Sequence, residues 1–201
     1  MSQIVLPLSS PSSGPPRIVV GNANAHVAEA LAAPATWPFH TAVLLGPPRS
    51  GRSLLARWFA ENGGEALDDA HRLDETVLFH RWNRAQEAGT PLLIVGGERP
   101  WNILLPDLRS RLGAALQLEI GFPDDAMAAD LLHALAEQRG LPLGAEAAAY
   151  LVPRAGRAFV ELEKLVAAID RISLERKVPA THSIWRAALE AVHGPEEPRL
   201  L

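Results

Sequence analysis

The sequence predicts a parallel α/β domain followed by an all-helical domain. Two apolar runs, 41–45 and 91–95, have the continuous hydrophobicity of strands that are buried on both faces of a parallel sheet. They alternate with segments of helical period, which is the pattern of a parallel α/β sheet. Beyond residue 122 every periodic segment has helical spacing. Residues 46–53 add a further observation, because their glycine spacing is that of a phosphate-binding loop.

Length, charge and composition limit the possible functions. The 201 residues suffice for an α/β domain with a small partner domain, and a hydrophobic content of 48% can build a core. A net charge of −4 argues against a protein whose main task is to grip DNA. The absence of cysteine excludes disulfides, thiol catalysis and cysteine-ligated metals. No apolar run approaches the roughly 20 residues of a membrane span and no signal peptide opens the chain, so a cytoplasmic protein is expected.

The elements of the α/β domain are expected to follow one another closely. The helix after the loop has an apolar stripe and ends at Gly63 and Gly64. Only a short interval separates this helix from Asp68, so the sheet should lack one strand and be small. The expected helices are 24–33, 51–62, 74–88 and 105–112, and the expected strands are 41–45, 65–69, 91–95 and 115–120.

The C-terminal part is expected to be all-helical, and its expected helices are 124–139, 145–152, 159–177 and 182–192. An α/β core followed by a small helical lid is the organisation of AAA+ modules, a likeness of fold that carries no function by itself. The expected domains are a disordered tail at 1–16, an AAA+ α/β core at 17–122, a helical lid at 123–193 and a frayed terminus at 194–201.

The segment GPPRSGRS matches the phosphate-loop pattern G-x-x-x-x-G-K-[ST] except that Arg52 replaces the lysine. Such a loop points backbone N–H groups inward and leads into a helix whose N-terminus attracts phosphate. Arginine keeps the positive charge but is a wide planar fork. The chain is therefore expected to hold a nucleotide and to hydrolyse it weakly or not at all. The candidate nucleotide-binding residues here are Gly46, Pro47, Pro48, Arg49, Ser50, Gly51, Arg52, Ser53 and Leu54.

Acidic residues follow two of the expected strands. Asp68 and Asp69 stand where a phosphate-loop ATPase places its magnesium-organising acid, and the alternative is a pair of acids in a turn. Glu98 and Arg99 stand where a polar sensor could touch a γ-phosphate, and the alternative is a salt-bridged loop.

Two further segments suggest contacts with partners. Arg111 lies at the far end of the α/β core and could act in trans as an arginine finger; the alternative is a surface arginine. The N-terminal segment QIVLPL, residues 3–8, gathers four apolar side chains in a tail that cannot pack on itself. Its alternative is a leader that folds onto its own domain.

Several motifs in this order resemble the AAA+ part of the bacterial replication initiator DnaA, and more closely its shorter Hda-type homologues. They are VVGN, GPPRSGRS, LDDAHRLDE, LLIVGGERP, LPDLRSRL and the helical lid, and they cover about residues 17–192. Three features favour the Hda type: Arg52, a tail similar to the hexapeptide that docks on the sliding clamp, and a chain that ends soon after the lid, without space for DnaA's DNA-binding domain.

The resemblance implies a regulator that binds the DNA polymerase sliding clamp and stimulates hydrolysis of DnaA-bound ATP. It implies that Arg111 is the trans-acting finger, that Asp68 and Asp69 belong to Walker B, and that Glu98 is the sensor I acid. The implied ligand is ADP or ATP, or no nucleotide, with Mg²⁺ held by Ser53 and Asp68. The implied clamp-binding residues are Gln3, Ile4, Leu6, Pro7 and Leu8.

The sequence departs from the family at the sensor II position, where Val160 cannot contact phosphate. Arg157, three residues earlier on nearly the same helix face, is the candidate substitute, and Val20 is a further candidate nucleotide contact. The alternative functions are a degenerate AAA+ adaptor without nucleotide, a small phosphate-loop kinase, and a helicase loader. The oligomeric state, including a homo-oligomer, stays open.

Overall fold

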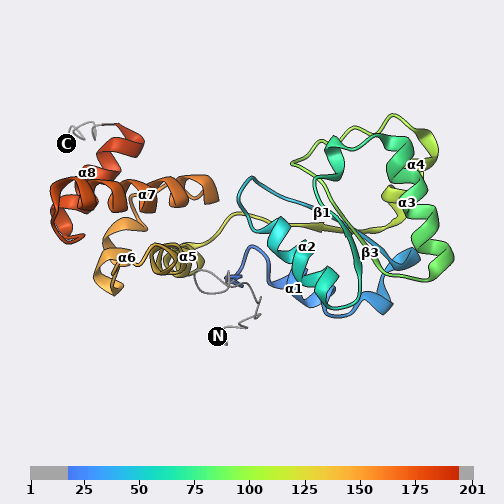
Figure 1. Ribbon diagram of the computed structural model, residues 1–201, viewed down its shortest axis with the longest axis horizontal. Coiled ribbons are helices and arrows are strands. Elements are labelled where there is room, and N and C mark those ends of the chain that lie inside the picture. The colour runs from blue at the N-terminus through green and yellow to red at the C-terminus, as the bar shows by residue number, and fades with distance from the viewer. Residues whose placement is uncertain (1–17, 195–201) are drawn as a thin grey trace. The chain divides into compact units, whose positions relative to one another are not determined.

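The computed structural model describes residues 18–194, which divide into two compact units (Figure 1). One unit is the α/β domain Asn22–Gly121, and the other contains residues 122–194 together with 18–21. Gly21 belongs to the helical unit by contact as well, because a Cβ built on it would lie 2.7 Å from Cγ of Met127. Each unit has a hydrophobic core of its own.

The α/β domain contains a small, wholly parallel sheet, as predicted. Its strands lie in the order β2-β3-β1-β4, and Val43 of β1 pairs with Ile94 of β3 and Gln117 of β4. The two central strands, β1 and β3, are completely buried, which explains their continuous apolar sequence. The strands are β1 (Thr41–Leu45), β2 (Glu65–Leu67), β3 (Leu92–Val95) and β4 (Leu116–Glu119).

Helices cover both faces of this sheet (Figure 1). Alternate strand residues such as Leu45 and Ile94 pack in one cluster with Leu78 of α3 and Leu108 of α4. On the other face α2 lies against β2 and β3. The helices are α1 (Ala25–Leu31), α2 (Arg52–Glu61), α3 (Glu75–Ala88) and α4 (Pro106–Ala114), and short 3₁₀ turns span Pro34–Thr36, Pro38–His40 and Ala70–Arg72.

The start of α3 is well defined. The Asp74 carboxylate caps the helix by accepting from the backbone N–H groups of Thr76 at 2.9 Å and Val77 at 3.2 Å. These hydrogen bonds, the one from Val77 above all, hold the pKa of the Asp74 carboxyl below its ordinary value. The cap therefore stabilises the helix above the carboxyl's unfolded-state pKa and loses this effect as the pH falls through the folded-state pKa.

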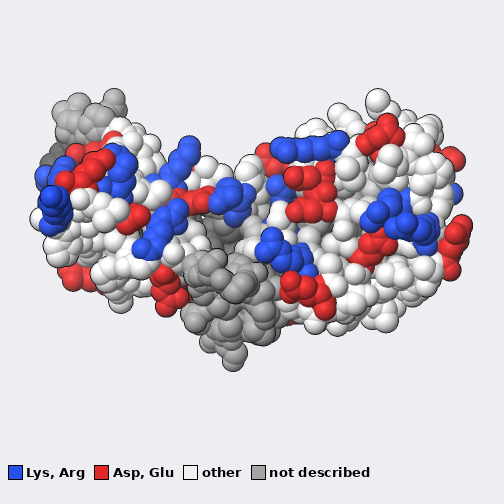
Figure 2. All heavy atoms as spheres, in the orientation of Figure 1, with Lys and Arg blue, Asp and Glu red and all other residues white. Residues whose placement is uncertain are grey.

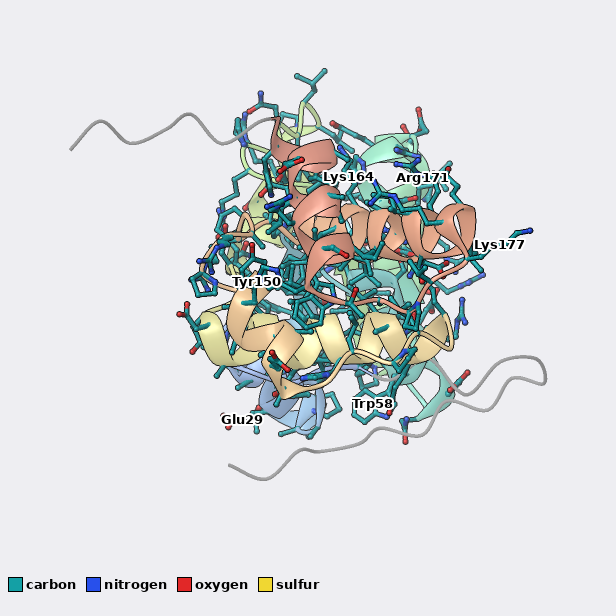
Figure 3. The ribbon with its side chains drawn as sticks, turned by 90° about the vertical axis from the view of Figure 1, so that its left-hand side faces the viewer. Glu29, Trp58, Tyr150, Lys164, Arg171 and Lys177 are labelled. Atoms are coloured by element: carbon teal, nitrogen blue, oxygen red, sulfur yellow. The ribbon has the colours of Figure 1, made fainter. Side chains whose placement is uncertain are left out.

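The second unit is all-helical, as predicted, and its four helices pack as a bundle. Its core comes from the apolar stripes of all four helices, with Leu132, Leu151, Leu165 and Ile184 almost fully buried. Charged side chains of α7 such as Lys164 and Arg171 point outward (Figure 3). The helices are α5 (Asp125–Gln138), α6 (Ala145–Leu151), α7 (Phe159–Arg176) and α8 (His182–His193).

The surface carries charges of both signs. Lys and Arg side chains are interspersed with Asp and Glu over the face of the described residues that Figure 2 shows, and no single sign dominates it. Between residues 18 and 194 the structure has no helix that is both long enough and apolar enough to cross a membrane.

Candidate nucleotide site

The loop at residues 46–53, which has the spacing of a phosphate-binding loop, connects β1 to α2. Its backbone conformation and its close packing require the glycines Gly46 and Gly51. Gly51 has a left-handed backbone with φ of 89°, which glycine adopts without strain. Gly46 lies against the end of β4, because a Cβ built on it would be 2.9 Å from Cβ of Ile120. The Gly46 N–H donates to the carbonyl of Gly97 at 3.2 Å. The loop is thereby anchored between the ends of β3 and β4.

The beginning of α2 has the character of an anion site. Its N-cap is Gly51, and no side chain caps the helix, so its first N–H groups lack an intrahelical acceptor. Ser50 is 5% exposed, and its Oγ has no hydrogen-bond partner among the described residues. Pro47 and Pro48 contribute no N–H. A bound phosphate would therefore be held by donors that follow Pro48.

Arg52, the substituted lysine position, is already engaged. Its Nη1 donates to the carbonyl oxygen of Gly96, directly after β3. This bond connects the start of α2 with the end of a neighbouring strand. A guanidinium has five N–H donors, so Arg52 can keep the Gly96 carbonyl and still offer donors to a phosphate.

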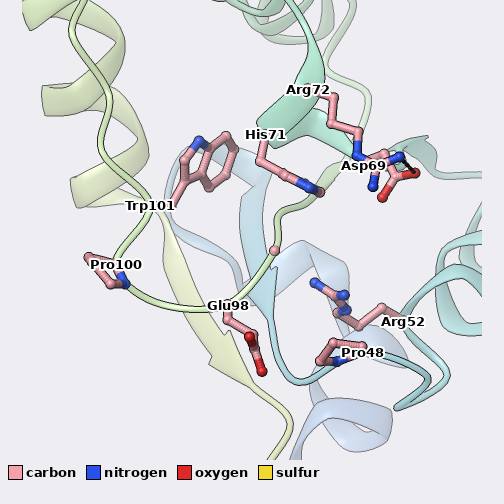
Figure 4. A pocket seen from close by; sticks show the side chains of 9 residues that line it. Pro48, Arg52, Asp69, His71, Arg72, Glu98, Pro100 and Trp101 are labelled. Carbon is pink, nitrogen blue, oxygen red and sulfur yellow. Dashed lines mark ion pairs between the residues drawn. The ribbon is translucent and has the colours of Figure 1, made fainter. Parts of the chain in front are cut away.

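A pocket of about 430 Å³ lies beside this loop. Its volume falls within the range of roughly 300–1,000 Å³ that is usual for small-molecule sites. Arg52, Asp69 and Glu98, which follow three different strands, border the same space (Figure 4). Pro48, another predicted site residue, lines the same pocket, so the structure brings four of the predicted site residues together. The lining residues are Pro48, Arg52, Asp69, His71, Arg72, Gly97, Glu98, Pro100 and Trp101.

The acidic pair lies at the edge of the sheet. Asp68 follows the edge strand β2, and its Oδ1 accepts from the Asp69 N–H at 2.9 Å. Asp69 has a φ of 49° and lies 3.8 Å from Nη1 of Arg72. Asp69 lines the pocket, whereas Asp68 does not. No group of three or more acidic or histidine side chains within 18–194 could hold a metal. The magnesium role of Ser53 and Asp68 stays a prediction.

The pocket also contains His71 and Trp101, which no sequence pattern identified as site residues. His71 lies in the 3₁₀ turn after β2, and a Cβ built on Gly97 would be 3.4 Å from its Cδ2. Trp101 closes another side. The signal available for His71 was its position just after the acidic pair. Arg99, by contrast, pairs with Glu119 at 2.9 Å, so the predicted alternative of a salt-bridged loop describes it.

Arg111 lies on α4 and is not part of the pocket lining. Its Nη1 donates to Oδ1 of Asn83 on α3. The carbon of its guanidinium is 4.4 Å from the ring centroids of both Phe79 and Trp82. The side chain is half-buried, whereas Arg109 on the same helix is exposed. Arg111 is therefore held in place by three side chains of α3.

Other predicted site residues lie elsewhere. The expectation that Arg157 shares a helix face with Val160 is wrong, because α7 begins at Phe159 and Arg157 precedes it. Arg157 forms an ion pair with Asp125 in the helical unit, to which Val20 also belongs. Their nucleotide contacts stay predictions. The predicted clamp-binding residues, Gln3, Ile4, Leu6, Pro7 and Leu8, lie outside the described residues.

Comparison with known proteins adds a family match in the helical unit. Residues 125–182 match the family model described as "Hda, lid domain". A protein of Haemophilus influenzae described as uncharacterized is 30% identical over 104 residues, which is 50% of this chain. The chain spans only 45% of the length of that curated relative.

Solved structures share the fold. Domain III of the replication initiation protein DnaA from Thermotoga maritima aligns with a TM-score of 0.72 at 14% identity, over 88% of this chain and 95% of that one. The RuvB Holliday junction branch migration motor of Thermotoga maritima aligns with a TM-score of 0.63 at 20% identity, over 88% and 72%. AMPPCP-bound DnaA from Aquifex aeolicus aligns with a TM-score of 0.62 at 16% identity, over 79% and 67%. At these identities the likeness concerns the fold.

Proposed function

We propose that this chain is a DnaA-related AAA+ protein of the Hda type and that it restrains chromosome replication by stimulating hydrolysis of DnaA-bound ATP. The observation that carries the proposal is the Hda lid match at residues 125–182 beside an α/β unit with the DnaA fold. The proposed partners are DnaA and the DNA polymerase sliding clamp, which would place the protein in the cytoplasm.

The position of Arg111 supports action on a partner's nucleotide. It does not line the chain's own pocket, and its guanidinium is half-buried on the surface formed by α3 and α4. An arginine finger supplied in trans stabilises the charge that develops on the transferred phosphoryl group. We assign this role to Arg111.

The chain's own loop is proposed to hold ADP rather than to hydrolyse ATP. Arg52 is engaged with the Gly96 carbonyl, and Val160 offers no phosphate contact from α7. Asp69 and Glu98 face the pocket but form no metal cluster with a third ligand among the described residues. The proposed contacts of Val20, Arg157 and Mg²⁺ with the nucleotide belong to the same hypothesis.

Added ADP should raise the thermal midpoint, because a ligand that binds only the folded state stabilises it by about 2.7 kcal/mol at a hundredfold excess over Kd. The measurement is a thermal melt with and without ADP. Arg52→Ala should lose most of the shift, and Arg57→Ala, an exposed arginine on the same helix α2, should keep it. A melt that ADP leaves unchanged would instead favour the degenerate AAA+ adaptor, for which the Arg52–Gly96 bond would be a structural tie.

Removing residues 1–9 should abolish binding to the sliding clamp, since the proposed anchors are Gln3 and the apolar side chains around Leu6. A pull-down with purified clamp measures this. Replacing Ser12 and Ser13 by alanine changes the same tail outside the segment and should leave binding intact. Binding that survives the deletion would refute the assigned docking segment.

The function itself is tested by turnover of DnaA-bound ATP with the full chain, in the presence and absence of clamp loaded on DNA. Faster hydrolysis that requires this chain supports the proposal. Unchanged hydrolysis under both conditions rejects it. Phosphate transfer to an added small-molecule acceptor would indicate the kinase alternative, and binding to a replicative helicase would indicate a loader.

A further inference from the structure

We propose that Phe79, Trp82 and Asn83 of α3 form a cradle that sets the orientation of the Arg111 guanidinium toward the partner's nucleotide. The proposal rests on the proposed function, because it assigns positioning residues to the arginine that acts in trans. The three cradle residues come from one helix and the arginine from another.

The two aromatic rings hold the guanidinium by its charge. Phe79 and Trp82 are three residues apart on α3 and therefore point to the same side of the helix. Both ring centroids lie 4.4 Å from the guanidinium carbon, inside the roughly 6 Å range of cation–π attraction. Each ring also packs against the core cluster beneath the sheet, so the rings themselves are supported from behind.

Asn83 sets the rotation of the guanidinium within its plane. Its Oδ1 accepts from Nη1 of Arg111 and so uses one of five N–H donors. The remaining donors stay available to phosphate oxygens, which a planar guanidinium binds in a bidentate manner. Because asparagine is neutral, it orients the group without cancelling its charge.

The two helices are connected so that the cradle and the arginine keep their relation. The Glu75 carboxylate, in the first turn of α3, accepts from the backbone N–H of Leu104 at 2.9 Å and of Leu105 at 2.6 Å, just before α4. Leu78 of α3 and Leu112 of α4 share one buried cluster. Phe79, Trp82, Asn83 and Arg111 are therefore parts of one packed body.

The effect of a carboxylate at position 83 distinguishes a purely structural contact between Asn83 and Arg111 from a positioning contact. If Arg111 served only to stabilise α3 against α4, a carboxylate at position 83 would improve the contact by adding an ion pair. If Arg111 must reach a partner's phosphates, the same carboxylate would retain the guanidinium and neutralise it. If Arg111 must reach a partner's phosphates, Asn83→Asp should therefore lower the stimulated turnover without lowering the stability of the folded chain. If Arg111 has only a structural role, Asn83→Asp should not lower the turnover.

The experiment measures stimulated turnover of DnaA-bound ATP, its dependence on the concentration of this chain, and the thermal midpoint, all with the full chain. Asn83→Asp should lower maximal turnover at least about tenfold, because the carboxylate would neutralise the guanidinium charge that must stabilise the partner's phosphoryl group. The thermal midpoint should stay unchanged or rise.

Phe79→Leu should also lower maximal turnover about tenfold without changing the half-saturating concentration of this chain. Phe79→Tyr keeps the aromatic ring and should therefore retain the turnover.

Outcomes for the cradle and for the proposed function can be told apart with Arg111→Ala. If Arg111→Ala removes stimulation while Asn83→Asp and Phe79→Leu retain it, the cradle is refuted and the proposed function stands. If Phe79→Tyr fails as badly as Phe79→Leu, the ring's charge attraction is refuted as the cause. If Arg111→Ala itself retains stimulation, the assignment of Arg111 fails and the cradle fails with it.

Discussion

Arg111→Ala should abolish the stimulated hydrolysis of DnaA-bound ATP. An arginine finger contributes about 10³- to 10⁵-fold to turnover, because its fork neutralises charge that develops on the equatorial oxygens of the phosphoryl group. Alanine cannot supply that charge, and no neighbouring side chain of the cradle is cationic: the contacts of Arg111 are Phe79, Trp82 and Asn83. Turnover of DnaA-bound ATP at saturating concentrations of this chain measures the loss.

Arg109→Ala is the matched control. Arg109 lies on the same helix, two residues away, and is exposed. Its loss should change stimulated turnover less than twofold, and clamp binding should be unchanged in both variants. The folded state of Arg111→Ala is checked by circular dichroism, since each lost cation–π contact contributes on the order of 1 kcal/mol. If Arg109→Ala removed the stimulation and Arg111→Ala retained it, the role of arginine finger would belong to Arg109.

Leu165→Ala should destabilise the helical unit by about 2–5 kcal/mol, the usual cost of truncating a buried leucine. Leu165 is fully buried in the middle of α7, which packs against both α5 and α8. Alanine would leave a cavity between these helices that neighbouring side chains fill only in part. Urea denaturation of the full chain, followed by circular dichroism, measures the change.

Leu174→Ala makes the same chemical change on the same helix at a side chain that is 71% exposed. It should alter the free energy of unfolding by no more than about 0.5 kcal/mol. Equal effects of the two substitutions would contradict the burial that defines the bundle. A loss confined to Leu165→Ala, together with loss of DnaA stimulation, would connect the family-matched unit with the proposed activity.

Much of the fold could be predicted because it depends on local patterns of apolar residues in the sequence. The continuous apolar runs of β1 and β3 predicted strands buried on both faces, and both are completely buried. The short interval between α2 and Asp68 predicted a small sheet, and the sheet has four strands. The helical periods after residue 122 predicted α5 to α8 because each stripe had to be covered by another helix.

The candidate site was predictable only in part, since its members come from separate loops. Spacing identified Arg52, Asp69 and Glu98, and all three line one pocket. His71 and Trp101 complete that pocket. His71 belongs to the segment LDDAHRLDE but matches no position that predicts a ligand contact, and only the packing of the two loops brings both residues there. The predicted contacts of Val20 and Arg157 stay predictions, because those residues belong to the other compact unit.

The sequence by itself determined the order of strands and helices along the chain, the loop between β1 and α2, and the residue types available for phosphate and partner contacts. These depend on periodicity and on backbone requirements, such as the left-handed φ of Gly51, that act between near neighbours. Only the tertiary structure decided which side chains meet. Arg52 donates a hydrogen bond to the carbonyl of Gly96, 44 residues away in the sequence. Arg111 donates one to Asn83 of α3, 28 residues away. Such contacts arise when helices and strands pack their buried faces together, a step that no local spacing records.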